Sequence, residues 1–161
     1  MDYVARLREE WADQLPDLDT SPAEVVARIT RIAAIVGRRH ESALARHDLT
    51  RAELELLAAL RRADRPLRAR EVGTVTDSPG ATLTKRLDHL HDAGLVARTT
   101  PERDRRGVLV SLTEAGRGLV DDVFPEQIER ERAVVEPLSA AEQQVLATLL
   151  ARVLERIDPA G

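Results

Sequence analysis

The stretch from Ser78 to Gly94, SPGATLTKRLDHLHDAG, constrains this chain most, because it carries the signals for both ends of one short helix. Serine caps helices, proline suits the first helical position, and Gly94 can end the helix in the left-handed conformation. At about 100° per residue, one side of this helix is a narrow apolar stripe. The stripe consists of Leu83, Leu87 and Leu90. The sequence therefore predicts a helix that packs one face and exposes the other.

The segments on either side of this helix predict a second helix before it and a β-hairpin after it. Upstream, RAREVGTVT (68–76) reads as a shorter helix that a tight turn at 77–80 joins to the first, which makes a helix-turn-helix. Downstream, LVARTT and VLVSL read as two strands flanking the basic tip PERDRRG. We therefore expect a mainly α fold with a small β-hairpin wing, that is, a winged helix-turn-helix.

This arrangement suits double-stranded DNA. Small residues on the exposed helix face allow close approach to a major groove, and Lys85 can reach a guanine edge. Serine and threonine hydroxyls suit phosphates, and arginines at a hairpin tip suit a narrow minor groove. The predicted DNA contacts are Ser78, Gly80, Thr82, Thr84 and Lys85 on the helix, and Arg103, Arg105 and Arg106 in the wing.

The distribution of charge along the chain also favours DNA binding by the winged helix. The 161-residue chain has a net charge of -4, but residues 61–106 contain eleven basic and seven acidic side chains. This segment is therefore +4 and the remainder is -8. One Trp, one Tyr and one Phe are too few for base-stacking recognition of single strands. The chain has no cysteine, no long apolar run and no signal peptide pattern, so we expect a cytoplasmic protein without membrane contact.

Amphipathic helices are predicted at both ends of the chain. Residues 2–15 form a short arm that carries Trp11, and capping boxes at Ser21, Thr50 and Ser139 begin three further helices. The apolar stripes of 21–46 and of the last helix are too large for a small winged helix to cover. We therefore expect a homodimer, with 1–46 as arm and dimerisation helix, 47–113 as DNA-binding domain and 114–161 as C-terminal dimerisation helices.

Signs of an enzyme are weak. The histidines of HLH (89–91) lie on different helix faces, and we find no HExxH, nucleotide-binding glycine loop or GxSxG. We therefore expect no catalytic residues, no metal and no cofactor.

The order of elements, with TLTKRLDHLHDAGLVART followed by PERDRRGVLVSLTEAGR, resembles the multiple antibiotic resistance regulator (MarR) family of dimeric transcription factors. The N-terminal arm resembles that of the branch which responds to urate and related purines. This resemblance implies a ligand site at Trp11, Glu55, Arg86 and Arg98, with glutamate where the branch has aspartate.

The residues themselves leave other interpretations open. Glu55 could be a solvated surface acid, and Arg86 could form a structural ion pair with Glu55 or Asp88. The resemblance implies a regulator, in particular a repressor, that binds a pseudopalindromic operator and is released by a small planar anion such as urate or another purine. Alternatives are a different acidic small molecule or natural product as effector, a ligand-independent DNA-binding protein, a winged helix used for protein contacts, and an unrecognised enzyme.

Overall fold

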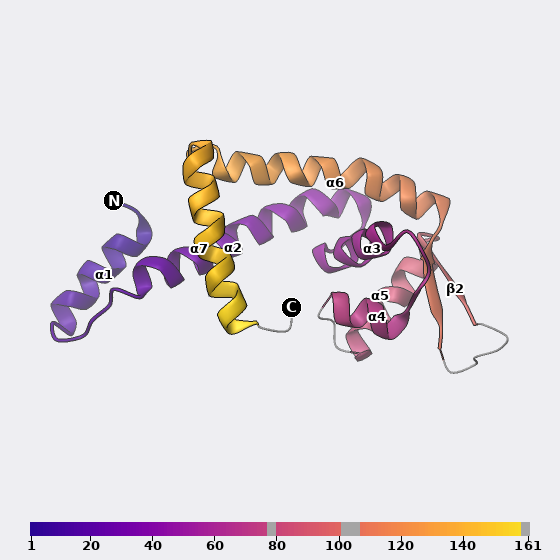
Figure 1. Ribbon diagram of the computed structural model, residues 1–161, viewed down its shortest axis with the longest axis horizontal. Helices are drawn as coiled ribbons and strands as arrows, with labels where there is room; N and C mark the ends of the chain where they lie inside the picture. Colours follow the sequence, from indigo (N-terminus) through magenta and orange to yellow (C-terminus); the bar gives the residue numbers. More distant parts are fainter. Residues whose placement is uncertain (77–79, 101–106, 159–161) are drawn as a thin grey trace.

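The structure is a computed structural model that describes residues 1–76, 80–100 and 107–158. It is mainly helical with one small sheet (Figure 1). The elements in chain order are α1 (Tyr3–Gln14), α2 (Ala23–Leu44), the 3-10 helix η1 (Ala45–His47), α3 (Arg51–Ala63), β1 (Leu67–Arg68), α4 (Ala69–Val75), α5 (Gly80–Asp92), β2 (Val96–Thr99), β3 (Leu109–Leu112), α6 (Glu114–Val135) and α7 (Ala140–Ile157).

The predicted hairpin is confirmed, and the sheet has a strand that the sequence did not reveal. Strands β2 and β3 pair antiparallel, with Arg98 opposite Val110. The two-residue strand β1 pairs with the other edge of β3, which gives the order β1-β3-β2. The wing is thereby hydrogen-bonded to the segment that leads into the helix-turn-helix.

Most predicted helix starts are confirmed. Thr50 and Ser139 form complete capping boxes with the glutamates three residues later, and Thr113 caps α6. The capping box predicted at Ser21 is wrong, because Pro22 is the N-cap of α2 and makes no side-chain cap. The carboxylate of Glu24 forms ion pairs with Arg8 of α1 and Arg28 of α2 instead, and the pair with Arg8 fastens α1 to α2.

The hydrophobic core lies in the winged helix half of the molecule. Leucines of α3 and α5 pack there with valines of α4, the sheet and α6. Side chains with almost no exposed surface include Leu56, Leu57, Val72, Leu90 and Val110. This single core holds α5 and the sheet in a fixed relation.

The other half of the molecule is extended and leaves apolar surface uncovered. In Figure 1, α6 runs from the sheet back above α3 and continues unbroken through Pro125, and α7 turns away from its far end. Helix α1 and the start of α2 lie at the end opposite to the sheet. The exposed apolar side chains include Val25, Val26, Ile29 and Ile32 on α2 and Val145, Leu149, Val153 and Leu154 on α7.

Candidate DNA-binding interface and effector pocket

Helix α5 buries one face and exposes the other, as predicted. Leu83, Leu87 and Leu90 are at most 6% exposed. Gly94, two residues past the helix, has a φ of +72°, in the left-handed region that favours glycine. Four of the predicted DNA contacts lie on the exposed side. They are Gly80, Thr82, Thr84 and Lys85.

Lys85 is the cation that this face presents. Among the described residues it has no ion pair or hydrogen-bond partner, whereas Thr84 donates its hydroxyl to the carbonyl of Gly80 in its own helix. The lysine ammonium can therefore donate to an external acceptor at no cost to the fold. The other predicted DNA contacts, Ser78, Arg103, Arg105 and Arg106, lie outside the described residues.

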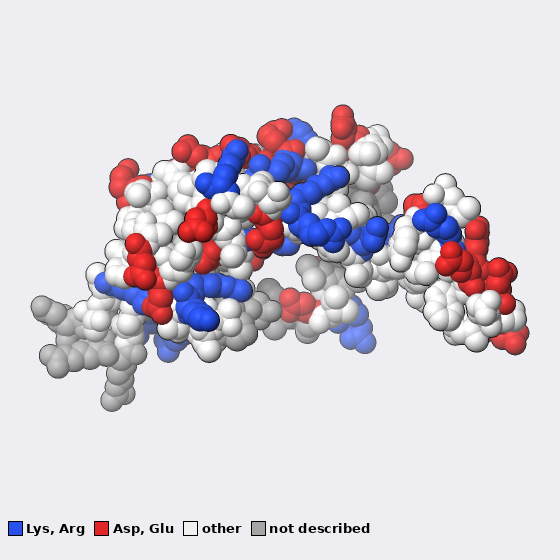
Figure 2. Space-filling view, turned by 180° about the vertical axis from the view of Figure 1, so that it is seen from behind, with Lys and Arg blue, Asp and Glu red and all other residues white. Residues whose placement is uncertain are grey.

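Acidic side chains gather at the opposite end of the molecule, over α1 and the loop after it (Figure 2). The exposed acids there are Glu9, Glu10, Asp13, Asp17 and Asp19. Because phosphates repel such a surface, this end is unsuited to nucleic acid. A DNA interface is therefore favoured at the helix-turn-helix end.

An ion pair between α3 and α5 was not predicted from the sequence. His89 Nδ1 lies 2.7 Å from Glu53 Oε1, and Glu53 Oε2 accepts from both the N–H and the hydroxyl of Thr50. Glu53 is 5% exposed, and Asp48 Oδ2 lies 3.8 Å from His89 Nε2. One buried carboxylate thus caps α3 and also holds the exposed helix α5. Only the tertiary structure shows this contact.

The two partners shift each other's ionisation. The hydrogen bond to Glu53 raises the pKa of His89 above its ordinary value. Burial alone would raise the pKa of Glu53, but the Thr50 N–H, the Thr50 hydroxyl and His89 outweigh burial and hold that pKa below its ordinary value. The pair therefore stabilises the fold most between the ordinary pKa values of the two groups, about 4.3 and 6.5.

We expect His89→Gln to destabilise the protein more at pH 6 than at pH 8.5. A raised histidine pKa contributes stability that is complete below the unfolded value and is lost as pH rises through the folded value. Urea unfolding of wild type and variant at both pH values measures the difference. His91→Gln, on an exposed histidine of the same helix, is the control. A pH-independent effect of His89→Gln would mean that this pair carries no charge.

A second ion pair fastens the wing to α5. Arg98 Nη1 on β2 donates to Asp88 Oδ1 on α5 over 2.6 Å. The Arg98 Nε and Nη2 atoms are buried and have no hydrogen-bond partner among the described residues. Arg98 therefore has a structural partner and two donors that an anion or water could satisfy.

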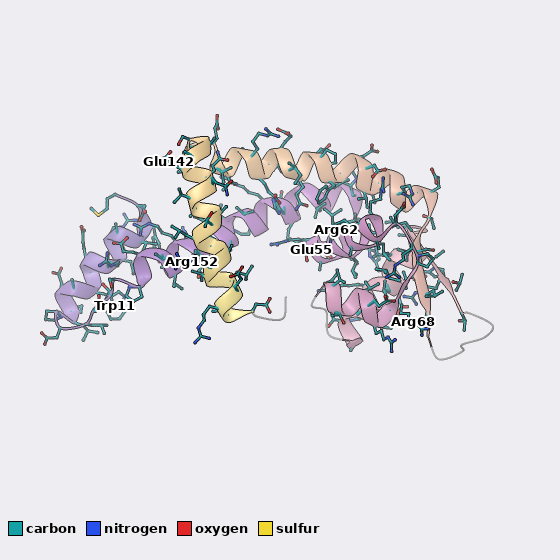
Figure 3. All side chains as sticks on the ribbon, in the orientation of Figure 1. Trp11, Glu55, Arg62, Arg68, Glu142 and Arg152 are labelled. Carbon is teal, nitrogen blue, oxygen red and sulfur yellow. The ribbon has the colours of Figure 1, made fainter. Side chains whose placement is uncertain are left out.

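The four residues implied as a ligand site do not come together in one chain. Glu55 lines a cavity of about 370 Å³ together with Arg62, whereas Trp11 lines a separate, mainly apolar cavity between α1 and α2. Figure 3 shows Trp11 near one end of the molecule and Glu55 and Arg62 together on α3. Arg86 is half-buried on α5. A single site with Trp11 therefore needs this residue from a second copy of the chain.

Glu55 on α3 and Asp88 on α5 each accept a hydrogen bond from an arginine. Glu55 accepts from Arg51 Nε over 2.9 Å, and Asp88 accepts from Arg98. Half of the Glu55 side chain remains exposed, which fits the surface-acid interpretation as well as a ligand contact.

The described part of the chain contains no candidate metal site and no candidate membrane span. No group of three or more histidine, cysteine or acidic side chains there could hold a metal ion. In the same residues, no helix combines the length and apolarity needed to cross a bilayer.

Comparisons with known proteins agree with this architecture. A family profile described as MarR family matches residues 47–107. The HTH-type transcriptional regulator PecS of Dickeya dadantii is 33% identical over 152 residues, which cover 93% of this chain and 92% of the relative.

Solved structures share the fold. The S. aureus MepR–DNA complex has a TM-score of 0.74 at 22% identity and covers 82% of this chain and 96% of its own. NadR in complex with 4-hydroxyphenylacetate has a TM-score of 0.64 at 24% identity and covers 80% and 91%. The chain belongs to the MarR family of winged helix-turn-helix transcription regulators.

Proposed function

We propose that this protein is a homodimeric repressor that binds a pseudopalindromic operator and is released by a small planar anion. The observation that carries the DNA-binding part is the exposed face of α5, where Lys85 has no protein partner in the described chain. Phosphate contacts set the register of such a helix, and contacts to base edges give sequence preference.

Dimerisation is supported by the uncovered apolar faces of α2 and α7. Val26 on α2 is 61% exposed and Leu154 on α7 is 58% exposed, each within a continuous apolar stripe. Contiguous apolar patches of this kind mark interaction surfaces, and closed two-fold dimers are the commonest assembly. Residues 1–46 and 114–161 would then form the dimerisation region around the two DNA-binding domains of 47–113. Two copies of α5 would meet successive major grooves at a spacing of about 34 Å.

The effector is proposed to be urate, a related purine or another acidic planar molecule. The support is Glu55 in a cavity, two buried Arg98 donors that find no acceptor among the described residues, and Arg86 on the DNA-reading helix. An anion that moves α5 or β2 by about an ångström would spoil the spacing of paired half-sites. A hundredfold effect on operator affinity requires about 2.7 kcal/mol of coupling.

Lys85→Ala should lower affinity for the specific operator by about 1–3 kcal/mol and relax sequence preference, because the ammonium can contact a guanine edge. Fluorescence anisotropy on the promoter region of the protein's own gene and on random DNA measures both quantities. Arg132→Ala, an exposed change on α6, is the control. Equal losses on both DNAs would make Lys85 a phosphate contact instead.

The effector assignment has its own test. Trp11→Ala and Arg86→Ala should each abolish release from DNA by the active compound among urate, xanthine and hypoxanthine, as followed by mobility shift and calorimetry. If none of the three binds below millimolar concentration, the purine assignment fails. If both variants respond like wild type to the active compound, Trp11 and Arg86 do not form the ligand site. If no compound releases the protein from DNA, the protein is a ligand-independent regulator.

A further inference from the structure

Lys85 differs chemically from every other basic side chain of this protein except the histidines. The sequence has 24 lysine and arginine side chains, and Lys85 is the only lysine among them. An unprotonated lysine amine is a nucleophile and a target of acylation, whereas an arginine guanidinium stays protonated and keeps its charge. Apart from the amine at the start of the chain, Lys85 therefore carries the only primary amine that an acyl donor can modify.

The fold does not engage this amine in an ion pair. Lys85 lies on the exposed face of α5 and has no ion-pair or hydrogen-bond partner among the described residues. One turn later on the helix, Asp88 is engaged by Arg98 over 2.6 Å. His89 is likewise engaged, 2.7 Å from a carboxylate oxygen of Glu53. The lysine thus lacks a carboxylate partner, which would favour its protonated and unreactive form.

The surroundings of Lys85 also admit a reagent. Long side chains in helices lean over the preceding turn, which here contains the small, exposed residues Ala81 and Thr82. Small neighbours leave room for a donor to approach the amine. The segment 61–106, which contains α5, carries a charge of +4, and such a surface attracts small anions. Acyl phosphates and coenzyme A thioesters are acyl donors with this charge.

We propose that Lys85 is an acylation site, and that its modification by a small anionic acyl donor switches off DNA binding. In the reaction, the unprotonated Nζ atom attacks the acyl carbonyl carbon, and a C–N bond forms. The bond from that carbon to the phosphate oxygen or thioester sulfur breaks, and its electron pair leaves with the phosphate or thiolate. The proton released from the amine passes to solvent. The product is an amide, and no oxidant or reductant takes part.

Acylation would act at the point where α5 meets DNA. The amide is uncharged, so the exposed face of α5 loses the cation that it presents. The added acyl group also fills space beside Ala81 and Thr82, where the helix must approach a major groove closely. This effect on DNA rests on the proposed function, whereas the reactivity of Lys85 does not depend on it.

Acetyl phosphate and acetyl coenzyme A, each added separately to the DNA-free full-length protein, test the site. Mass spectrometry of the intact chain and of its peptides gives the rate at which Lys85 is acetylated. We expect acetylation at least as fast as that of a blocked lysine in free solution with one or both donors. A slower reaction with both donors would overturn the site, and reaction with one donor alone would identify that donor as the source.

Fluorescence anisotropy on the promoter region of the protein's own gene tests the switch. Acetylation should weaken operator binding by about 10- to 100-fold, in line with the loss of one contact to a base edge. The matched variant is Lys85→Arg, whose operator affinity should not change on treatment, whatever its starting value. Both proteins keep the N-terminal amine, so the comparison removes any effect of its acetylation. Equal loss of affinity in both proteins would overturn the switch.

Bound operator should in turn slow the acetylation of Lys85 but not that of the N-terminal amine, because linked sites affect each other reciprocally. If Lys85 is acetylated and wild type still binds its operator unchanged, or if operator gives no protection, the switch is wrong. If Lys85 reacts at the expected rate but the untreated protein binds no DNA from its promoter region, the acylation site stands and the regulator function fails.

Discussion

Replacing Gly116 by alanine is expected to destabilise the winged helix by more than about 3 kcal/mol. A Cβ at this position would lie 2.0 Å from the carbonyl oxygen of Leu95 and 2.9 Å from its carbonyl carbon. Neither atom can move away easily, because the Leu95 carbonyl accepts from the Thr113 N–H and the Thr113 hydroxyl bonds the carbonyl of Gly94. Helix α6 would have to separate from the segment that joins α5 to β2.

Gly118 provides the matched comparison two residues later in the same helix. A Cβ there has nothing within 4 Å, so Gly118→Ala should raise stability by about 0.5–1 kcal/mol through the unfolded state. Urea unfolding of both variants gives opposite signs if α6 approaches the Leu95 backbone as closely as described. A Gly116→Ala protein as stable as wild type would contradict this contact.

Removal of α7 by ending the chain after Leu138 is expected to abolish specific operator binding and to give aggregates or an unfolded chain. The deletion removes one of the two large apolar faces and leaves the face of α2, with Val25 56% and Ile32 51% exposed, without its proposed cover. Light scattering after size exclusion, with circular dichroism, measures assembly and folding. Ending the chain after Ile157 keeps all of α7 and should preserve the dimer.

A soluble, folded monomer from the Leu138 truncation would contradict the proposed dimer. The same experiment bears on DNA binding, because one copy of α5 meets a single half-site and loses the affinity that two linked contacts provide.

Local sequence signals predicted much of the fold because they describe interactions within a few residues. The stop at Gly94, the caps at Thr50 and Ser139 and the two strands beside the basic tip were all predicted in this way. Strand β1 is only two residues long, too short for any periodicity. The capping box predicted at Ser21 had the right spacing, but ion pairs with Arg8 and Arg28 engage the glutamate that should have completed it.

The candidate site was less predictable, because its residues meet only through tertiary packing. The spacing of Glu55 and Arg62 on one helix face was visible in the sequence, yet nothing local showed that α4 and α6 would close a cavity over it. For Glu53, the spacing of the capping box predicted the contact of one carboxylate oxygen with Thr50. The contact of the other oxygen with His89 was not predicted. For Trp11, similarity to a family suggested a common site with Glu55 that a single chain does not form.

The separation of acidic arm and basic DNA-binding segment has a consequence for how the protein finds DNA. Residues 61–106 carry +4 and the rest of the chain -8, and one group of exposed acids lies at the α1 end (Figure 2). In the field of a polyanion such a molecule experiences a torque that turns the helix-turn-helix toward the duplex before contact. Encounters in which the acidic α1 end approaches the DNA first are thereby disfavoured. This orientation acts over about one Debye length, so added salt should slow association more than it speeds dissociation.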